Sequence, residues 1–173
     1  LWRAAECLSA AQKSAFRMLI LLPLRKQELL LSGWQNVDCR WLFVPAERTK
    51  NHEESALFIS DFAFSVLQAP ANETDLLFTT NNRTPLTLGT KLSIKLTDES
   101  GVSDWVYHDF RRTFSTHMNE RGHPFHIIEA CLNHRDPTRR GVAGVYNRPE
   151  YRAAKQTVLQ ARSNLAEEAV IGG

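Results

Sequence analysis

One stretch, from His108 to Tyr146, constrains the fold of this chain more than any other. It opens as HDFRRTFSTHMNERG, in which aromatic and apolar side chains recur at helical spacing until Gly122, a residue type that commonly follows a helix end. His108 and Arg111 are three residues apart, so in a helix they lie on one face and can reach the same anionic ligand. The predicted helix therefore buries one set of side chains, Phe110, Phe114, His117 and Met118, and presents another, His108, Arg111 and Ser115.

Two shorter motifs follow this helix. Residues 126–132 have the apolar pattern of a second helix and lead into LNH, which places His134 at the helix end. Asn133 can adopt the left-handed conformation that such a turn needs. A polar, glycine-containing segment then leads to VYNR and Tyr146, and its composition predicts a flexible connection.

Two more motifs lie upstream. Pro23 interrupts a strongly apolar helix and so delivers Arg25 in the segment LPLRKQEL, where Glu28 is close enough to orient the guanidinium. An aromatic and β-branched run, a polar turn and a second short strand then give a β-hairpin pattern with Lys50 at its tip. Taken alone, a lysine on a loop tip is most often a solvated charge.

In this order, the motifs resemble the catalytic domain of the tyrosine recombinases, the phage and genomic-island integrase family. The matches run from about Trp2 to Tyr151, and the resemblance implies a mainly α fold with a small three-stranded antiparallel β-sheet. Two places depart from the family pattern, because Leu22-Pro23-Leu24 and Asn133 stand where glycine is usual. The resemblance implies one set of catalytic residues, Arg25, Lys50, His108, Arg111, His134 and Tyr146, with Glu28 in support.

The resemblance also implies a reaction. Tyr146 would attack a DNA phosphodiester, forming a 3′-phosphotyrosyl enzyme and a free 5′ hydroxyl. Arg25 and Arg111 would stabilise the phosphoryl oxygens, while His108 would act as general base. His134 would donate to a phosphoryl oxygen and Lys50 would protonate the leaving oxygen. No metal or cofactor is expected, since the sequence has no two-metal carboxylate cluster, no HExxH and no glycine-rich phosphate loop.

Other assignments remain open from the sequence. Tyr107 and Tyr151 compete with Tyr146 as nucleophile, although Tyr107 directly opens the anion-binding helix and Tyr151 follows a proline inside the last helix. The function favoured by the motifs is that of a site-specific recombinase that integrates or excises a mobile element, and two alternatives remain. One is a non-catalytic DNA-binding protein of the same fold, and the other is an enzyme like the type IB topoisomerases.

Charge distribution favours double-stranded DNA as the partner. Residues 1–50 carry 8 basic and 4 acidic side chains, residues 51–100 carry 3 and 7, and residues 101–155 carry 9 and 6. The motifs thus lie in the two basic blocks, as binding to a polyanion requires. The longest apolar run is too short to span a membrane and no leader pattern opens the chain, so we expect a cytoplasmic protein of bacterial or phage origin. The three cysteines are expected to be buried thiols.

The chain is expected to form one domain over residues 1–173, the C-terminal catalytic domain of a longer recombinase whose upstream DNA-binding domain is absent here. In the full-length protein we expect a tetramer on paired DNA sites. A final helix over residues 150–169 is expected to dock on a neighbouring subunit, with its own core as the alternative. The remaining expected elements are helices over residues 2–11, 14–22, 26–33, 61–68 and 84–96 and a third strand over residues 75–78.

Overall fold

The computed structural model describes residues 1–67, 75–81, 83–134 and 148–172, with side chains from Tyr151 onward in the last segment. Tyr146 and the connection expected to be flexible lie outside the described residues. The described chain is mainly helical with a small antiparallel sheet, which confirms the predicted class. Its α-helices are α1 (Ala10–Leu21), α2 (Lys26–Leu30), α3 (Asp61–Val66), α4 (Thr90–Ser100), α5 (Tyr107–Glu120), α6 (Phe125–Cys131) and α7 (Arg148–Ile171), and its 3₁₀ helices are η1 (Ala4–Cys7), η2 (Trp34–Asn36) and η3 (Ala46–Arg48).

The sheet has the strand order β1-β2-β3, formed by β1 (Val37–Asp38), β2 (Trp41–Val44) and β3 (Ser55–Phe58). The predicted hairpin is present as β2 and β3, but the predicted third strand over residues 75–78 is wrong. That segment makes only an isolated bridge between Gly33 and Leu76. Its backbone bonds go to the chain after α2, where Trp34 N donates to Asp75 O and Leu77 N donates to Ser32 O.

Two helix starts differ from the sequence prediction. The opening segment forms only the short helix η1, and α1 begins at Ala10 because Ser9 caps it in a reciprocal pair with Gln12. The helix expected to start near Pro85 begins instead at Thr90. Residues 85–89 form no regular element and bury Leu86 and Leu88 in the core, which outweighs the local preference of proline for a first helical turn.

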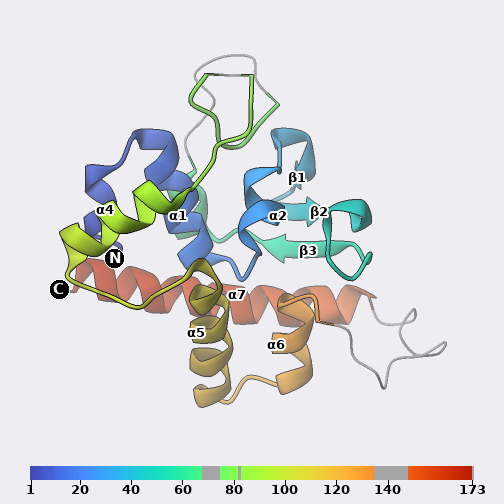
Figure 1. The fold of residues 1–173 in the computed structure, drawn as a ribbon. Helices are drawn as coiled ribbons and strands as arrows, with labels where there is room; N and C mark the ends of the chain where they lie inside the picture. Colours follow the sequence, from blue (N-terminus) through green and yellow to red (C-terminus); the bar gives the residue numbers. More distant parts are fainter. Residues whose placement is uncertain (68–74, 82, 135–147, 173) are drawn as a thin grey trace.

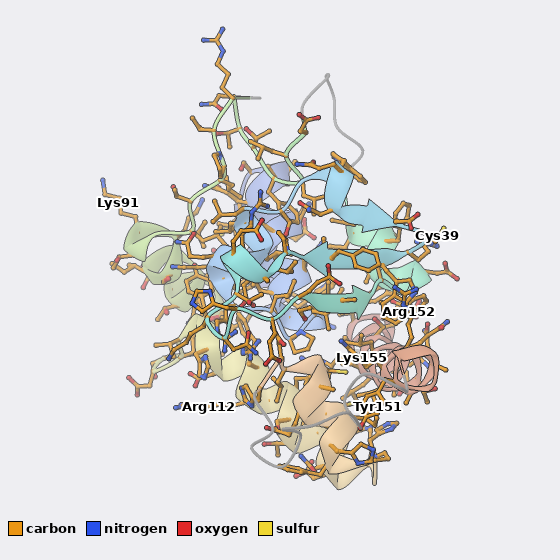
Figure 2. All side chains as sticks on the ribbon, turned by 90° about the vertical axis from the view of Figure 1, so that its right-hand side faces the viewer. Cys39, Lys91, Arg112, Tyr151, Arg152 and Lys155 are labelled. Atoms are coloured by element: carbon orange, nitrogen blue, oxygen red, sulfur yellow. The ribbon has the colours of Figure 1, made fainter. Side chains whose placement is uncertain are left out.

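The long helix α7 holds the two halves of the domain together. Figure 1 shows α5 and α6 on one side of it, with the sheet, α1 and α2 on the other. Near its N-terminal end, Arg152 stacks over the rings of Trp41 and Phe43 of β2, while the Tyr151 ring packs against His126 of α6. Figure 2 shows these two side chains leaving α7 in different directions, toward the sheet and toward α6.

The middle of α7 is anchored by a buried cation, Arg162. Its guanidinium donates to the carbonyl of Ile20 at 2.8 and 3.0 Å and lies 3.3 Å from Nδ1 of His117. Burial lowers the pKa of Arg162 to about 10, so it remains charged at neutral pH. The adjacent Ser163 hydroxyl bonds the Ser60 hydroxyl at 2.6 Å. This part of the helix therefore packs on its own core, the alternative named from the sequence, and docking on a neighbouring subunit stays a prediction.

The cysteines also differ from expectation, because only Cys131 is buried, whereas Cys39 is exposed and Cys7 is partly exposed. Burial raises the pKa of the Cys131 thiol to about 12. Cys131 is thus an inert core residue in α6.

Candidate active site

Arg25 is held at the turn between α1 and α2. Pro23 ends the apolar helix, and Arg25 stands in extended conformation directly before α2. Both oxygens of Glu28 bind it, since Oε1 accepts from Nη1 at 2.7 Å and Oε2 accepts from the Arg25 backbone N–H at 2.8 Å. The Glu28 side chain is 4% exposed and that of Arg25 is 27% exposed. Glu28 therefore fixes the guanidinium while leaving part of it accessible, and among the described residues Nε and Nη2 of Arg25 have no hydrogen-bond partner.

Arg111 lies deeper than the helical pattern predicted. It is 3% exposed, a depth that the spacing of residues in α5 did not indicate. Nη1 donates to the carbonyl of Pro23, and Nη2 donates to the carbonyl of Leu132 at 2.6 Å. The turn before α2 and the end of α6 close over it, which no pattern within α5 could show. Arg111 thereby joins the segment that carries Arg25 to the segment that carries His134.

Charge and burial act on Arg111 together. Burial and then the positive charge of Arg25 lower its pKa to about 10, while the carboxylates of Glu28 and Glu129 oppose the change. The group therefore stays protonated at neutral pH. Its Nε is buried without a hydrogen-bond partner among the described residues, which leaves a donor of this guanidinium unused.

His134 lies beside Arg111 at the end of α6. Its Nε2 is 3.3 Å from Arg111 Nη2, and its Nδ1 is 2.9 Å from Glu129 Oε2. A guanidinium can only donate, so Nε2 must accept and the ring proton is assigned to Nδ1, which donates to Glu129. Asn133, the residue before His134, has a φ of 49°, which confirms the predicted left-handed turn.

His108 stands at the start of α5, on the same side as these groups. Helix α5 begins as predicted, because the Asp109 carboxylate accepts the backbone N–H of Val106 at 2.8 Å. The pKa of His108 is lowered by burial and then by the positive charges of Arg111, Arg112 and Arg25, while Asp109 opposes this. His108 is therefore neutral at neutral pH and able to accept a proton.

This charge environment gives a first prediction. Arg112 is exposed and pairs with Asp109 at 3.0 Å, so Arg112→Gln removes a positive charge near His108 and releases a negative one. Both effects favour the imidazolium, and the pKa of His108 should rise in the variant. Titration of the His108 ring followed by NMR measures it, with Arg121→Gln at the other end of α5 as the matched control. An equal shift in both variants, or none in Arg112→Gln, would contradict the proposed charge coupling.

The remaining two predicted site residues are Lys50 and Tyr146. Lys50 is exposed on the loop between β2 and β3 and makes no hydrogen bond to another described residue. Its neighbour Asn51 binds Asn133, so the loop that carries Lys50 lies against the turn that carries His134. Tyr146 is outside the described residues. The structure thus brings Arg25, His108, Arg111 and His134 together, along with two contributors that the sequence reading missed, Glu129 and Asn51.

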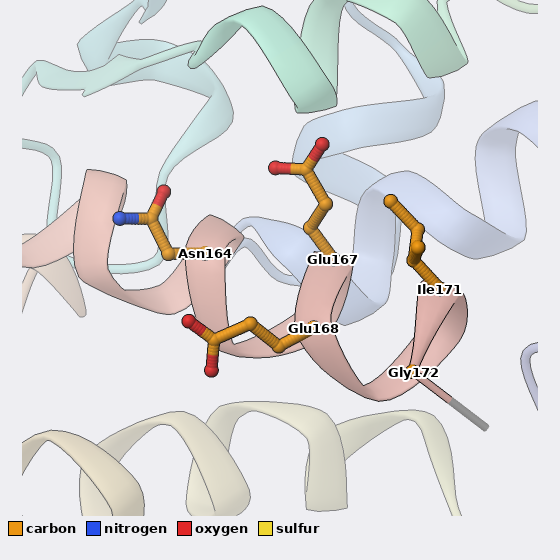
Figure 3. A pocket seen from close by; sticks show the side chains of 5 residues that line it. All are labelled: Asn164, Glu167, Glu168, Ile171 and Gly172. Atoms are coloured by element: carbon orange, nitrogen blue, oxygen red, sulfur yellow. The ribbon is translucent and has the colours of Figure 1, made fainter.

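Metal-binding groups and membrane-spanning helices are absent from the described residues. No group of three or more histidines, cysteines, aspartates or glutamates in residues 1–67, 75–81, 83–134 and 148–172 is placed to hold a metal ion. A cavity of about 450 Å³ at the C-terminal end of α7 is lined by Asn164, Glu167, Glu168, Ile171 and Gly172 (Figure 3). Its two carboxylates and lack of a cation make it unsuited to a phosphate. No helix in the described part of the chain is long and apolar enough to cross a membrane.

Comparison with known proteins identifies relatives of the chain. The family model described as the Phage integrase family matches residues 2–152. Prophage integrase IntA of Escherichia coli (strain K12) is 26% identical over 174 residues, which cover 95% of this chain and 41% of the relative. Prophage integrase IntZ of the same strain is 28% identical over 178 residues, which cover 99% of this chain and 44% of the relative. The chain thus spans less than half the length of these relatives, and no solved structure matches it significantly.

Proposed function

This chain belongs to the phage integrase family, and from that premise we propose that it is the catalytic domain of a site-specific tyrosine recombinase. It cuts and rejoins DNA strands through a 3′-phosphotyrosyl intermediate, and so integrates or excises a mobile element. The observation that carries the proposal is the convergence of two arginines from α5 and the turn before α2 with two histidines from α5 and the end of α6.

Such a cluster suits phosphoryl transfer. Attack on a phosphodiester concentrates negative charge on the non-bridging oxygens, and preorganised cationic donors stabilise that charge more in the transition state than in the ground state. Arg25 is oriented by Glu28, and Arg111 is held between two backbone carbonyls. Both guanidiniums are therefore held in place before the phosphate arrives. The positive charge of Arg25 lowers the pKa of Arg111, and an anion bound near both guanidiniums would relieve this repulsion.

In the proposed reaction, the Tyr146 oxygen bonds to phosphorus and the bond from phosphorus to the 5′ oxygen breaks. The neutral imidazole of His108 takes the phenolic proton, while the Lys50 ammonium gives a proton to the departing 5′ oxygen. The lowered pKa of His108 supports its assignment as base, because the imidazole must be unprotonated before the step. The phosphotyrosyl bond then keeps the energy needed for rejoining.

The state of His134 adds a condition to this scheme. In the free protein its Nε2 accepts from Arg111, so it cannot donate from that atom to a phosphoryl oxygen. We propose that the arriving phosphate displaces this contact and that His134 takes a second proton at Nε2, with Glu129 stabilising the imidazolium. The same displacement would free Nη2 of Arg111 to bind the phosphate.

We also propose how the domain works within a longer protein. An upstream DNA-binding domain would close around the duplex and bring four catalytic domains onto paired sites. This chain alone would contact double-stranded DNA mainly through phosphates, and such binding weakens by roughly 0.9 log units per log unit of salt for each phosphate neutralised.

The test is covalent trapping. We expect this chain, incubated with nicked duplexes tiled across the DNA that flanks its gene, to yield a protein–DNA adduct that survives denaturing electrophoresis, because loss of the short cleaved strand prevents rejoining. The adduct should form equally well in excess EDTA. Binding without an adduct would show a non-catalytic DNA-binding protein, and relaxation of plasmids that lack the flanking sequences would show topoisomerase-like activity instead.

A further inference from the structure

A pair of asparagines links two segments of the proposed site that are far apart in sequence. Asn51 Nδ2 donates to the backbone oxygen of Asn133 at 3.0 Å and to its side-chain oxygen at 3.2 Å. Asn133 Nδ2 donates back to Asn51 Oδ1 at 3.2 Å and to the carbonyl of Glu53 at 3.1 Å. The two amides thus form a reciprocal clasp, and both residues of the clasp are only partly exposed.

On one side, the clasp closes a loop that is already ordered by its own bonds. Thr49 is 3% exposed, and its hydroxyl lies within hydrogen-bond distance of two carbonyls to which it can donate, those of Ala46 at 3.0 Å and Glu53 at 2.9 Å. The Glu53 backbone N–H donates back to that hydroxyl and to Asn51 Oδ1. Lys50 lies between Thr49 and Asn51, so the residues on both sides of it are fixed while its own side chain stays exposed.

On the other side, the clasp holds the turn that ends α6. Asn133 stands between two residues that contact the Arg111 guanidinium. The carbonyl of Leu132 accepts a hydrogen bond from it, and the ring of His134 lies beside it. Asn133 has a positive φ, which glycine adopts at less cost, but glycine has no side chain that could form the clasp. The residue type is therefore explained by the turn and the clasp together.

We propose that Asn51 and Asn133 are positioning residues for the general acid, and that their clasp holds the Lys50 ammonium within reach of the leaving 5′ oxygen. This inference rests on the function proposed above. A lysine side chain is long and flexible, so an exposed loop tip alone would spread its ammonium over many positions. General acid catalysis depends on geometry, and a misplacement of about 1 Å can cost roughly 10²-fold in rate.

The test compares two leaving groups. A normal phosphodiester releases an alkoxide that needs a proton, whereas a substrate with sulfur in the 5′ bridging position releases a thiolate that leaves without one. We expect Asn51→Ala to slow single-turnover cleavage of the normal substrate at least about tenfold. The sulfur-bridged substrate should be cleaved at nearly the wild-type rate, and DNA affinity should stay close to that of the wild type.

Four further variants sharpen the result. Asn133→Gly keeps the left-handed turn and should reproduce the Asn51→Ala pattern, and combining the two should add little because both break one clasp. Adding Asn51→Ala to Lys50→Ala should also add little. Asn81→Ala is the matched control, since Asn81 orders its own loop through bonds to Thr79, Arg83 and Thr84 and has none to the site.

The outcomes separate the two proposals. If wild-type protein forms no adduct with either substrate, the proposed function fails. If wild-type protein is active but Asn51→Ala cleaves both substrates equally slowly, the clasp supports the whole site and does not position the acid. Unchanged cleavage of both substrates by Asn51→Ala and Asn133→Gly would show that the clasp has no role in the reaction.

Discussion

Replacement of Tyr146 by phenylalanine is expected to abolish covalent attachment to DNA while leaving DNA binding nearly unchanged. The variant keeps the aromatic ring and loses only the attacking oxygen. The measurement is the covalent trapping experiment with nicked duplexes, run beside a binding assay at the same salt concentration. A covalent adduct with Tyr146→Phe would show that another tyrosine is the nucleophile.

The two other tyrosines are the controls for this experiment. Burial raises the pKa of Tyr107 and so disfavours the phenolate, although the Ser93 hydroxyl, which donates to the Tyr107 hydroxyl at 3.3 Å, partly opposes this. Its ring packs among Phe16, Trp105 and Phe110, and Lys26 stacks over its face. The Tyr151 ring packs on His126 between α6 and α7. Tyr107→Phe and Tyr151→Phe are therefore expected to form the adduct.

Removal of either arginine of the cluster should lower cleavage by at least roughly 10²-fold, the usual scale for losing one preorganised donor to a developing oxyanion. The variants Arg25→Ala and Arg111→Ala are compared under single-turnover conditions at a temperature where both are folded. Replacement by lysine should restore only part of the rate, because the forked geometry is lost. Full activity in a lysine variant would mean that the arginine acts only as a charge that attracts phosphate.

Substitutions at the same two positions should differ in their effect on the stability of the protein. Arg111→Ala leaves the buried carbonyls of Pro23 and Leu132 without their donor, so we expect the free energy of unfolding to fall by about 2 kcal/mol or more. Arg25→Lys keeps a cation near Glu28 on a partly exposed side chain and should change stability much less. Denaturant unfolding followed by circular dichroism measures both. A fully stable Arg111→Ala protein would contradict the joining role assigned to this guanidinium.

Local sequence determined much of this protein. The start of α5 follows from the Asp109 cap, the end of α1 from Pro23, and the left-handed turn before His134 from the conformational preference of Asn133. Such features depend on residues within about one helical turn of each other, so their spacing appears directly in the sequence. The order of the motifs was enough to indicate the family that the comparison then showed.

Tertiary structure alone decided the rest. The burial of Arg111 depends on carbonyls of Pro23 and Leu132, and the Asn51–Asn133 clasp joins residues 82 positions apart. The choice of Val37–Asp38 rather than residues 75–78 as the third strand, and the docking of α7 on its own core, were likewise settled by partners distant in the chain. Every residue has a backbone carbonyl and every asparagine has the same amide, so the sequence does not show which of these groups will bind each other. Only the folded chain determines the pairs.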